Sequence, residues 1–510
     1  MTRPLIITLF MALFLIVLNF TITAIASPYI VGDLGGDRYI AVYGLSFYGI
    51  GAAITIPLAK PLGSRFKAKK LFLYCMASFS LTTLFSGLAP TYFIFVACRL
   101  LMGMASGPFY ALLSHTFSCL IPEDKKIVAA WMFMTILVVV PVIGASYGGT
   151  VAYLYHWRAA FLGSALIAIL LIFPLSAYLK KVKIPPLAAG FDWIGWSFYA
   201  VGIFCIAFAL TAAQQLDWYR SPILVAAIIL GIPCIGYFLV RSFNHETPAI
   251  NLRLFASPVF ALAMLCLSLL FGVYFGSIVL LSIWLTLDAQ FTPIWIGVLI
   301  GSMGIAGLFP RFIIENRLGK IHPLIFIAFA TLLLGFSCFY TTQFDSDINF
   351  SRIAFSRILA GFGLALFLPS IFTMISESSG LDEWIDAFNI FQILRSLSSA
   401  LGVAFFTIAW QRRSVFYHER LGEKLNAKSV AAQTFFNKVE TLHVPGDSLA
   451  QLNDYLDRSS SSLALDDVFY LMGWILAGLF VLICFILIAK RLFTKHESKT
   501  DSQQVPIGEQ

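Results

Sequence analysis

Long apolar segments follow one another along nearly the whole chain, separated by short polar stretches. A helix needs about 20 mostly apolar residues to cross the hydrocarbon core of a bilayer. Segments of that kind occupy residues 4–26, 40–59, 71–89, 92–117, 127–150, 159–179, 191–212, 222–240, 257–284, 294–312, 323–340, 353–375, 385–409 and 468–489. The pattern predicts an all-α polytopic membrane protein with fourteen transmembrane helices.

The distribution of charge gives this protein an orientation. Only 12% of the residues are charged, about half the usual share of a soluble domain. With the N-terminus in the cytoplasm, the short cytoplasmic segments hold twenty of the 34 basic residues and the short external loops hold four. Cytoplasmic loops are typically the basic ones. We therefore expect a multi-pass protein of the cell inner (plasma) membrane with both termini in the cytoplasm. The same asymmetry explains the net charge of +8 without a nucleic-acid partner.

The first apolar segment has an alternative interpretation. Arg3, the apolar run and the small residues Ala24 and Ala26 resemble a secretory signal peptide with its cleavage site. The run is longer than the apolar region of a signal peptide, and cleavage would leave thirteen spans. We therefore expect the segment to stay in the protein as its first transmembrane helix.

The sequence motifs that mark metal centres and common enzymes are absent from this chain. The eight cysteines are scattered in or beside apolar segments, without a CxxC pair, so we expect small buried side chains and no metal site. No HExxH, GxSxG or Walker A motif occurs either. The sequence predicts a protein that is not an enzyme and that needs no cofactor.

Two short motifs recur in the second half of the chain. Residues 99–103 (RLLMG) are echoed by 357–361 (RILAG), and 64–67 (SRFK) by 316–319 (NRLG). Many secondary carriers are built from such repeats, with the substrate site between the two halves. Chance matching of common residues is the alternative.

The repeat predicts six, two and six transmembrane helices. It places a six-helix bundle at 1–183, two linking helices at 184–250 and a second six-helix bundle at 251–489, followed by a cytoplasmic tail at 490–510. Residues 410–467 form a long external loop of the second bundle in this scheme. Its polar sequence without heptads predicts short surface helices and no separate domain.

Residues 18–28 (LNFTITAIASP) resemble the first-helix motif of the fourteen-helix drug:proton antiporters, the EmrB/QacA-like branch of the major facilitator superfamily. Further similarities lie at Tyr48, Pro57, 61–71, 99–107, Pro141, Gly144, Gly148, Gly149, 157–161, 191–195, Gln215 and Trp218. The resemblance implies a major facilitator fold with pseudo-twofold related halves. It also implies a secondary active transporter, most simply a proton-driven efflux permease for drugs or amphipathic toxic compounds. A periplasmic adaptor and an outer-membrane channel are partners that the resemblance makes plausible, beside the lipid bilayer and the small-molecule substrate.

The resemblance also points to residues for gating and conformational change. They are Arg65, Lys67 and Lys69 in the basic loop, Arg317 in its repeat, and Pro141, Gly144, Gly148 and Gly149 in the fifth span. In the fifth span the residues themselves support this role. Pro141 removes a backbone donor and can bend the helix, while Gly144 and Gly148 allow another helix to come close. Ordinary packing glycines are the alternative.

The chain departs from the family pattern where proton coupling is expected. Asn19 stands where the branch usually has an acid in the first helix, and Ser64 stands where it has one in the basic loop. Lys60 and Lys67 replace glycines of that loop. No acid lies deep in any predicted span, and the nearest ones, Asp192, Asp288, Glu377 and Asp386, sit at helix ends. The sequence therefore leaves open which group carries a coupling proton.

Three arginines lie within the predicted spans instead. A charged side chain at mid-bilayer is costly and usually faces a cavity, so we expect Arg99, Arg357 and Arg395 at a transport cavity. The other candidates for its lining are Asn19, Met102, Asn389 and Gln392. Arginine binds carboxylate or phosphate in a bidentate manner, which favours an anionic substrate. The alternative is that backbone carbonyls and polar neighbours accept the hydrogen bonds of these arginines.

Three functions remain open at this point. The first is efflux of drugs or amphipathic toxic compounds, which the resemblance favours. The second is export of a specific anionic metabolite such as a siderophore, which the arginines and the missing acids favour. The third and most remote is a membrane sensor that transports nothing.

Overall fold

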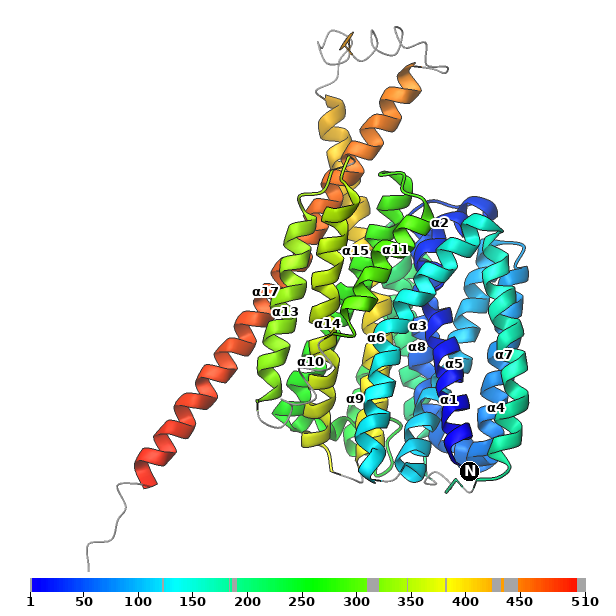
Figure 1. The fold of residues 1–510 in the computed structure, drawn as a ribbon, viewed down its shortest axis with the longest axis vertical. Helices are drawn as coiled ribbons and strands as arrows, with labels where there is room; N and C mark the ends of the chain where they lie inside the picture. Colours follow the sequence, from blue (N-terminus) through cyan, green and yellow to red (C-terminus); the bar gives the residue numbers. More distant parts are fainter. Residues whose placement is uncertain are drawn as a thin grey trace, which may run out of the picture.

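The computed structural model describes residues 2–121, 123–182, 184–185, 190–309, 321–345, 347–380, 383–423, 433–434 and 448–501. In these residues the regular structure is helical, and the helices run alongside one another (Figure 1). Twelve of the described helical runs are long and apolar enough to cross a membrane. One of them, Ile40–Leu88, holds two of the predicted spans, and the shorter apolar helix Pro293–Ala306 lies at the tenth. The all-α membrane fold predicted from the sequence is confirmed.

The first half of the chain forms seven α-helices. They are α1 (Thr2–Thr21), α2 (Thr23–Leu34), α3 (Tyr43–Thr55), α4 (Ala59–Leu88), α5 (Tyr92–Leu120), α6 (Glu123–Leu154) and α7 (Trp157–Leu179), with the short 3-10 turns η1 (Ile40–Val42) and η2 (Ile56–Leu58). We call this group the first bundle. The first predicted span, 4–26, covers α1 and the start of α2, and the helix breaks at Ile22.

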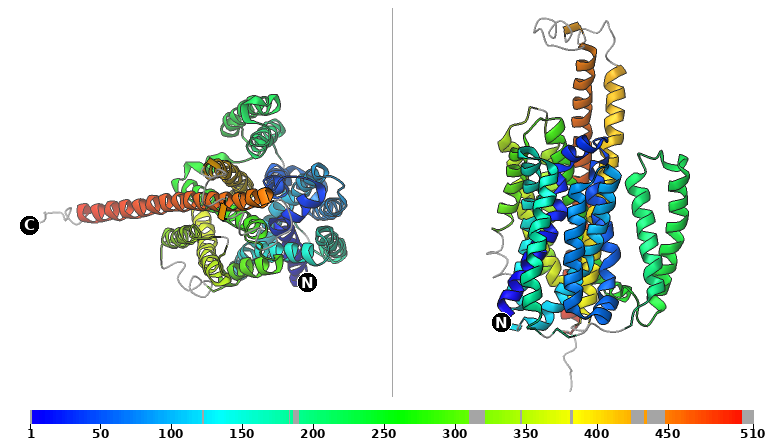
Figure 2. Two further views of the ribbon diagram at one scale, coloured as in Figure 1. Left: turned by 90° about the horizontal axis from the view of Figure 1, so that it is seen from above. Right: turned by 90° about the vertical axis from the view of Figure 1, so that its right-hand side faces the viewer.

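The described helices from residue 258 onward form a second bundle. They are α10 (Pro258–Leu287), α11 (Pro293–Ala306), α13 (Pro323–Thr341), α14 (Phe350–Ser378), α15 (Trp384–Glu423) and α17 (Ser448–Asp501), preceded by the turn η4 (Leu252–Ala256). The two bundles lie side by side in Figures 1 and 2. They meet where α3 packs on α15, α6 on α11 and α2 on α10.

Two helices stand beside both bundles. They are α8 (Trp193–Ala212) and α9 (Pro222–Asn244), joined through the turn η3 (Trp218–Arg220). Figure 2 shows this pair as a separate hairpin, in which α8 contacts α3 and α15. The position fits the predicted linking helices, although the division into six, two and six stays a prediction.

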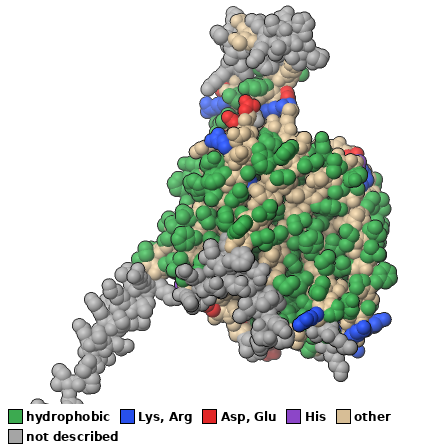
Figure 3. All heavy atoms as spheres, in the orientation of Figure 1, with side chains coloured by type: hydrophobic (Ala, Val, Ile, Leu, Met, Phe, Trp, Pro, Cys, Tyr) green, Lys and Arg blue, Asp and Glu red, His purple; other side chains and the backbone are tan. Residues whose placement is uncertain are grey.

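The outer surface of the bundles is apolar. Figure 3 shows hydrophobic side chains over most of the visible face, with basic side chains near one end and around the projecting helices. Large side chains such as Phe93, Phe173 and Phe485 are at least two-thirds exposed. A soluble monomer rarely exposes such an extended apolar surface, whereas lipid tails can cover it. The structure therefore supports a protein embedded in a membrane.

The two ends of the molecule are easily told apart. The N-terminus lies at one end, which we call the N-side, and α15 and α17 project beyond the opposite end, which we call the hairpin side (Figures 1 and 2). Chain direction then places the start of α15 on the N-side and the end of α10 on the hairpin side.

In the expected loop at 410–467, the described stretches 410–423 and 448–467 belong to two long helices and do not form separate short surface helices. Helix α15 continues to Glu423, and α17 begins at Ser448. Cross-helix contacts explain the difference, because Arg413 and Tyr417 of α15 bind Asp467 of α17 at 3.0 and 2.9 Å. These contacts join residues distant in sequence and leave no heptad pattern.

The predicted basic loop is also helical. Helix α4 begins at Ala59, and Lys67 interrupts it with a φ of 61° and a ψ of 140°. A positive φ normally favours glycine. The family pattern has a glycine at this position, so Lys67 adopts a conformation that suits the residue it replaces.

Candidate functional site

Helix α15 carries a polar stripe toward the first bundle. Asp386, Asn389, Gln392, Arg395 and Ser399 are spaced three or four residues apart, which places them on one face of a helix. The last four are buried. The neighbouring turn of α15 packs on α3, where the side chain of Ser46 donates a hydrogen bond to the carbonyl of Ala400 at 3.1 Å. The stripe therefore lies at the boundary between the two bundles.

Arg395 lies at the centre of this stripe. Its Nε donates to Oε1 of Gln392 at 2.7 Å, and its guanidinium carbon is 5.3 Å from the ring centroid of Tyr110 in α5. The side-chain Nε2 of Gln392 and Oδ1 of Asn389 are buried without a hydrogen-bond partner. Buried polar atoms nearly always find a partner, so these two atoms are available to a ligand. The structure brings together the three α15 residues that the sequence proposed for the cavity.

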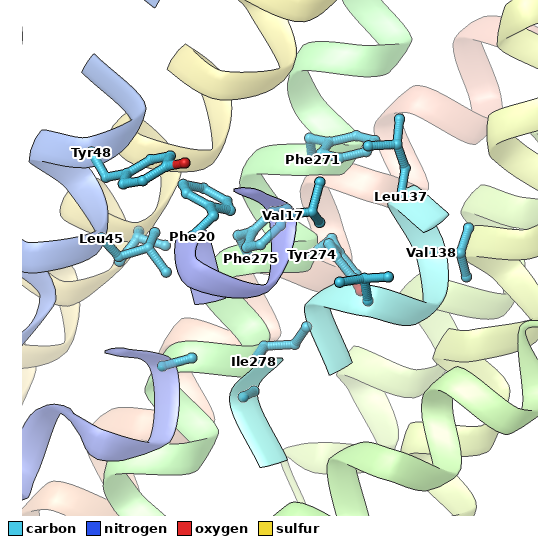
Figure 4. Packing of buried hydrophobic residues seen from close by; sticks show 14 of the residues in the cluster. Val17, Phe20, Leu45, Tyr48, Leu137, Val138, Phe271, Tyr274, Phe275 and Ile278 are labelled. Carbon is cyan, nitrogen blue, oxygen red and sulfur yellow. The ribbon is translucent and has the colours of Figure 1, made fainter. Parts of the chain in front are cut away.

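Aromatic side chains fill the boundary beside the polar stripe. Figure 4 shows Phe20 between Tyr48 of α3 and Phe275 of α10. The ring centroids of Phe20 lie 5.3 Å from Tyr48 and 5.2 Å from Phe275. The boundary thus offers aromatic surface from both bundles close to a buried cation and free amide atoms. Such a combination suits a molecule with an apolar body and a polar group.

Arg99 lies inside the first bundle and not at the boundary. Its Nε donates to the carbonyl of Gly44 at 2.9 Å, and its two Nη atoms donate to the carbonyls of Asn19 and Phe20 at 2.8 and 3.1 Å. In an unbroken helix the last two carbonyls would accept from amides four residues on. The break at Ile22 frees them, and Arg99 takes the place of those amides.

Asn19 and Met102 share this internal position. The Nδ2 of Asn19 donates to the carbonyl of Leu15 at 3.0 Å, and its Oδ1 accepts from Ser164 of α7 at 3.0 Å. The sulfur of Met102 lies 3.2 Å from an Nη of Arg99. All three predicted cavity residues are fully buried in the first bundle. The structure thus shows the polar atoms of Asn19, Arg99 and Met102 in contacts within the first bundle, and their place at a transport cavity stays a prediction.

Arg357 is buried inside the second bundle. Its Nη2 lies 3.0–3.3 Å from the hydroxyl oxygens of Ser356, Thr341 and Ser337, while its Nε and Nη1 have no hydrogen-bond partner. Phe469 of α17 lies under the guanidinium at 5.9 Å. Arg357 contacts α13 and α17 of its own bundle, so it also lies away from the polar stripe of α15.

The glycines of α6 allow close helix packing. A Cβ on Gly144 would lie 2.5 Å from the carbonyl oxygen of Leu18, and one on Gly148 would lie 2.3 Å from that of Ile22. Gly149 faces Ile25, and Pro141 lies inside the helix. The predicted close approach is present, and its partners are α1 and α2 at the helix break.

The basic segment is linked to the second bundle on the N-side. Lys60 at the start of α4 forms an ion pair with Asp386 at the start of α15. Arg65 and Lys67 are exposed, and Lys69 is partly buried. Arg317, the predicted counterpart in the repeat, lies outside the described residues.

The sequence did not single out Tyr110 or Arg38. Tyr110 follows Arg99 by eleven residues, about three helical turns, so it lies near the same face of α5. That spacing is the signal that was missed. Arg38 contacts Asp288 across 250 residues, and nothing in the local sequence indicates the contact.

A groove of about 550 Å³ lies between α6 and α11. Its lining is almost entirely apolar and consists of Val139, Val142, Ile143, Ser146, Tyr147, Thr150, Val151, Gly301, Gly304, Ile305 and Leu308. Exposed side chains at its rim, such as Ile305, place it on the outer surface of the bundles. Across the described parts of the chain, no group of three or more histidine, cysteine or acidic side chains could hold a metal ion.

Comparison with known proteins gives a consistent result. The chain is 26% identical to the fatty acid resistance protein FarB of Neisseria gonorrhoeae over 485 residues, which cover 95% of each chain. It is 25% identical to the multidrug export protein EmrB of Escherichia coli K12 over 479 residues, which cover 94% of this chain and 93% of EmrB.

Solved structures show the same fold at lower identity. A bacterial homologue of the human lysosomal transporter Spinster superposes with a TM-score of 0.60 at 14% identity, covering 94% of this chain and 96% of the homologue. A peptide transporter gives a TM-score of 0.62 at 14% identity, covering 94% of both chains. The family model of the Major Facilitator Superfamily matches residues 9–403. On this match and the helical architecture, the chain belongs to the major facilitator superfamily.

Proposed function

We propose that the protein is an efflux permease that expels drugs or other amphipathic toxic compounds across the inner membrane. The observation that carries the proposal is the boundary between the bundles, where Arg395 and the free amide atoms of α15 lie beside aromatic side chains from both bundles. A secondary carrier binds its substrate at such a boundary between two related halves.

The relatives support export as the direction of transport. The names of EmrB and FarB describe multidrug export and fatty acid resistance. Both relatives match almost the full length of the chain, so the whole transport unit is shared. We also propose that this unit consists of a six-helix bundle at 1–183, two linking helices at 184–250, a second six-helix bundle at 251–489 and a cytoplasmic tail at 490–510. In that scheme the protein moves its substrate without chemically changing it.

We further propose that the proton gradient drives export and that both termini are cytoplasmic, so that the N-side faces the cytoplasm. Single cysteines at Ser64 on the N-side and at Gln343 on the hairpin side test the orientation. Both residues are exposed. The two variants are produced in intact cells, each in a protein without its native cysteines. A membrane-impermeant maleimide should then label Gln343→Cys and should not label Ser64→Cys. The opposite pattern would reverse the orientation and the direction assigned to every loop.

Transport into everted membrane vesicles tests the function itself. Vesicles that contain the protein should accumulate an amphipathic dye when a pH gradient is imposed, and vesicles without it should not. Collapse of the gradient with a protonophore should abolish the accumulation. Failure to move any amphipathic probe would contradict the proposal. Accumulation that persists in the presence of the protonophore would contradict only the proposal that the proton gradient drives export.

A specific observation favours a second candidate, the export of anionic amphiphiles or of a specific anionic metabolite. Arg395 is a buried cation whose resolved partners are a neutral amide and an aromatic ring. A bound carboxylate would offset the cost of that charge. Arg395→Gln should then weaken export of a fatty acid or a polycarboxylate by at least about 1.5 kcal/mol, the scale of one charge-assisted hydrogen bond. Export of a cationic dye should change little, and equal loss of both would exclude charge recognition by Arg395.

The α6 residues Pro141, Gly144, Gly148 and Gly149 are proposed to serve the conformational cycle, together with Arg65, Lys67, Lys69 and Arg317 on the basic segments. The N-side ion pair of Lys60 with Asp386 supports such a role for the start of α4, because it connects the two bundles. A periplasmic adaptor and an outer-membrane channel remain proposed partners. Co-purification of the protein with an adaptor from its own cells would test that assembly.

A further inference from the structure

Asp288 is a fully buried carboxylate at the end of α10 on the hairpin side. An Nη of Arg38 lies 3.1 Å from its Oδ1 and 3.5 Å from its Oδ2. The hydroxyl of Ser461 donates to Oδ2 at 2.9 Å. The carboxylate therefore has a built set of donors from two other parts of the chain.

These contacts close the hairpin side between the bundles. Arg38 and Tyr39 precede η1 in the first bundle, whereas Asp288 and Ser461 belong to the second. The ring of Tyr39 lies 5.5 Å from that of Trp410 in α15, edge to face. The indole of Trp410 donates to the carbonyl of Ser461 at 2.9 Å. Separation of the bundles at this end must break the ion pair and expose Asp288 to water.

Among the acidic residues that the structure describes, only Asp192 and Asp288 are buried. Asp192 pairs with Arg241 at 2.7 Å, and both belong to the hairpin of α8 and α9. Asp386 does connect the bundles, but its side chain is 21% exposed. Asp288 is thus the buried acid, within the described chain, whose surroundings change when the bundles separate.

The ionisable groups that face Asp288 come from two segments. Arg38, with Asp37 and Tyr39 beside it, comes from the first bundle, and Arg458 comes from α17. Burial raises the pKa of Asp288 above that of an ordinary carboxyl, while Arg38, Ser461 and Arg458 act in the opposite direction. The net direction is upward, because removal from water penalises the charged form more than its partners favour it.

We infer that Asp288 is a proton-binding residue whose protonation stabilises closure of the hairpin side. The inference deepens the proposed function and rests on it, since it needs a cycle in which this side opens. Asp288 would supply a site for proton binding in a chain whose first helix has Asn19 in place of an acid.

The direction of the pH effect follows from linkage. In the open form the carboxyl is in water, with an ordinary pKa of about 3.9. The closed form has the higher pKa, so it binds the proton more tightly, and acidification favours closure. The stabilisation of the closed form is complete below the pKa of the open form. It is lost as the pH rises through the pKa of the closed form.

Distance measurements between spin labels on the two bundles test the inference. Tyr155 in the first bundle and Gln343 in the second lie on the hairpin side and are exposed. In a background without native cysteines, Tyr155→Cys and Gln343→Cys carry the labels in reconstituted protein. Between pH 8 and pH 4 we expect the short-distance population to grow at least twofold as the pH falls.

Two variants separate proton binding from a merely structural role. Asp288→Asn mimics the neutral carboxyl, so it should favour the short distance at every pH and abolish the response. Arg38→Gln removes a group that lowers the pKa of Asp288, so the midpoint of the response should move to higher pH. A response that is unchanged in Asp288→Asn, or a midpoint that moves downward in Arg38→Gln, would overturn the inference.

Asp192→Asn is the matched control, because it neutralises the other buried acid without touching the boundary between the bundles. It should respond to pH as the wild type does. The labels report closure without transport, so this experiment stays informative if no substrate is found. A normal distance response with no dye accumulation in vesicles would count against the proposed function and leave the proton site standing.

Discussion

Arg99 and Arg357 occupy matching positions in the two copies of one motif, yet the two bundles treat them differently. The guanidinium of Arg99 donates to three backbone carbonyls. The guanidinium of Arg357 reaches three hydroxyl groups through one nitrogen, and its Nε and Nη1 have no partner. Both side chains are almost fully buried. The difference therefore lies in the acceptors that each bundle provides.

The first helix of each bundle explains this difference. In the first bundle that span breaks at Ile22 into α1 and α2, which frees the carbonyls of Asn19 and Phe20. In the second bundle the corresponding span, α10, runs unbroken over 30 residues. Its carbonyls are used within the helix and none is left for Arg357. The repeated arginine thus stabilises a broken helix in one copy and carries a poorly compensated charge in the other.

The largest effect is expected from Arg99→Leu. The substitution leaves the buried carbonyls of Asn19 and Phe20 without donors and removes a further bond to the carbonyl of Gly44, and each such loss costs about 1–3 kcal/mol. We expect the free energy of unfolding to fall by at least about 3 kcal/mol, allowing for partial relaxation. Thermal unfolding in detergent, followed by tryptophan fluorescence, measures the change. If the free energy of unfolding falls by less than it does for an average surface substitution, the break at Ile22 is stable without Arg99.

A moderate effect is expected where α6 packs on the same break. A Cβ on Gly148 would lie 2.3 Å from the carbonyl oxygen of Ile22, and backbone cannot easily move away. Gly148→Ala should therefore destabilise the protein by about 1–3 kcal/mol, the usual cost of overpacking. Gly402 tests the other bundle, because its Cβ would lie 2.4 Å from Gly272 in α10. We expect a similar loss for Gly402→Ala.

Gly301→Ala is the control for both substitutions. No atom lies within 4 Å of a Cβ at Gly301, which faces the groove between α6 and α11. Alanine in a helix should stabilise by about 0.5–1 kcal/mol relative to glycine at such a position. Equal destabilisation by all three variants would mean that the loss does not come from close helix packing.

The sequence predicted the helices well because long apolar runs can only be satisfied in a bilayer as helices. It also proposed Asn389, Gln392 and Arg395 for one cavity, and their spacing of three residues places them on one helix face. The break at Ile22 was not predicted, because Thr21, Ile22 and Thr23 contain neither glycine nor proline. The surroundings of Arg99 depend on that break and were therefore missed.

A smaller effect, of opposite sign, is expected from Lys67→Gly. Lys67 has a φ of 61° and a ψ of 140°, a conformation that costs a non-glycine residue about 1–3 kcal/mol. Glycine should relieve most of that cost and stabilise the protein by about 1 kcal/mol. The measurement is again thermal unfolding in detergent. Lys69→Gly is the control, because Lys69 is helical and glycine should cost about 1 kcal/mol there.

The smallest effect is expected from Arg357→Leu, the counterpart of Arg99→Leu. Removal of the guanidinium leaves no acceptor without a partner, because the hydroxyl of Ser356 still bonds those of Ser337 and Thr341 at 3.0 and 2.8 Å. It also removes a buried charge that forms no ion pair with an acid of the described chain, and an apolar replacement of a buried charge is often neutral or stabilising.

We therefore expect the free energy of unfolding of Arg357→Leu to lie within about 1 kcal/mol of the wild type, measured beside Arg99→Leu. Arg357→Ala separates charge from packing, because it removes the same charge but leaves the volume of the side chain empty. It should be less stable than Arg357→Leu by about 2–3 kcal/mol, the lower range for a large-to-small change in a core. If Arg357→Leu is as unstable as Arg99→Leu, the two copies of the motif are equivalent after all. The unbroken α10 would then not explain the surroundings of Arg357.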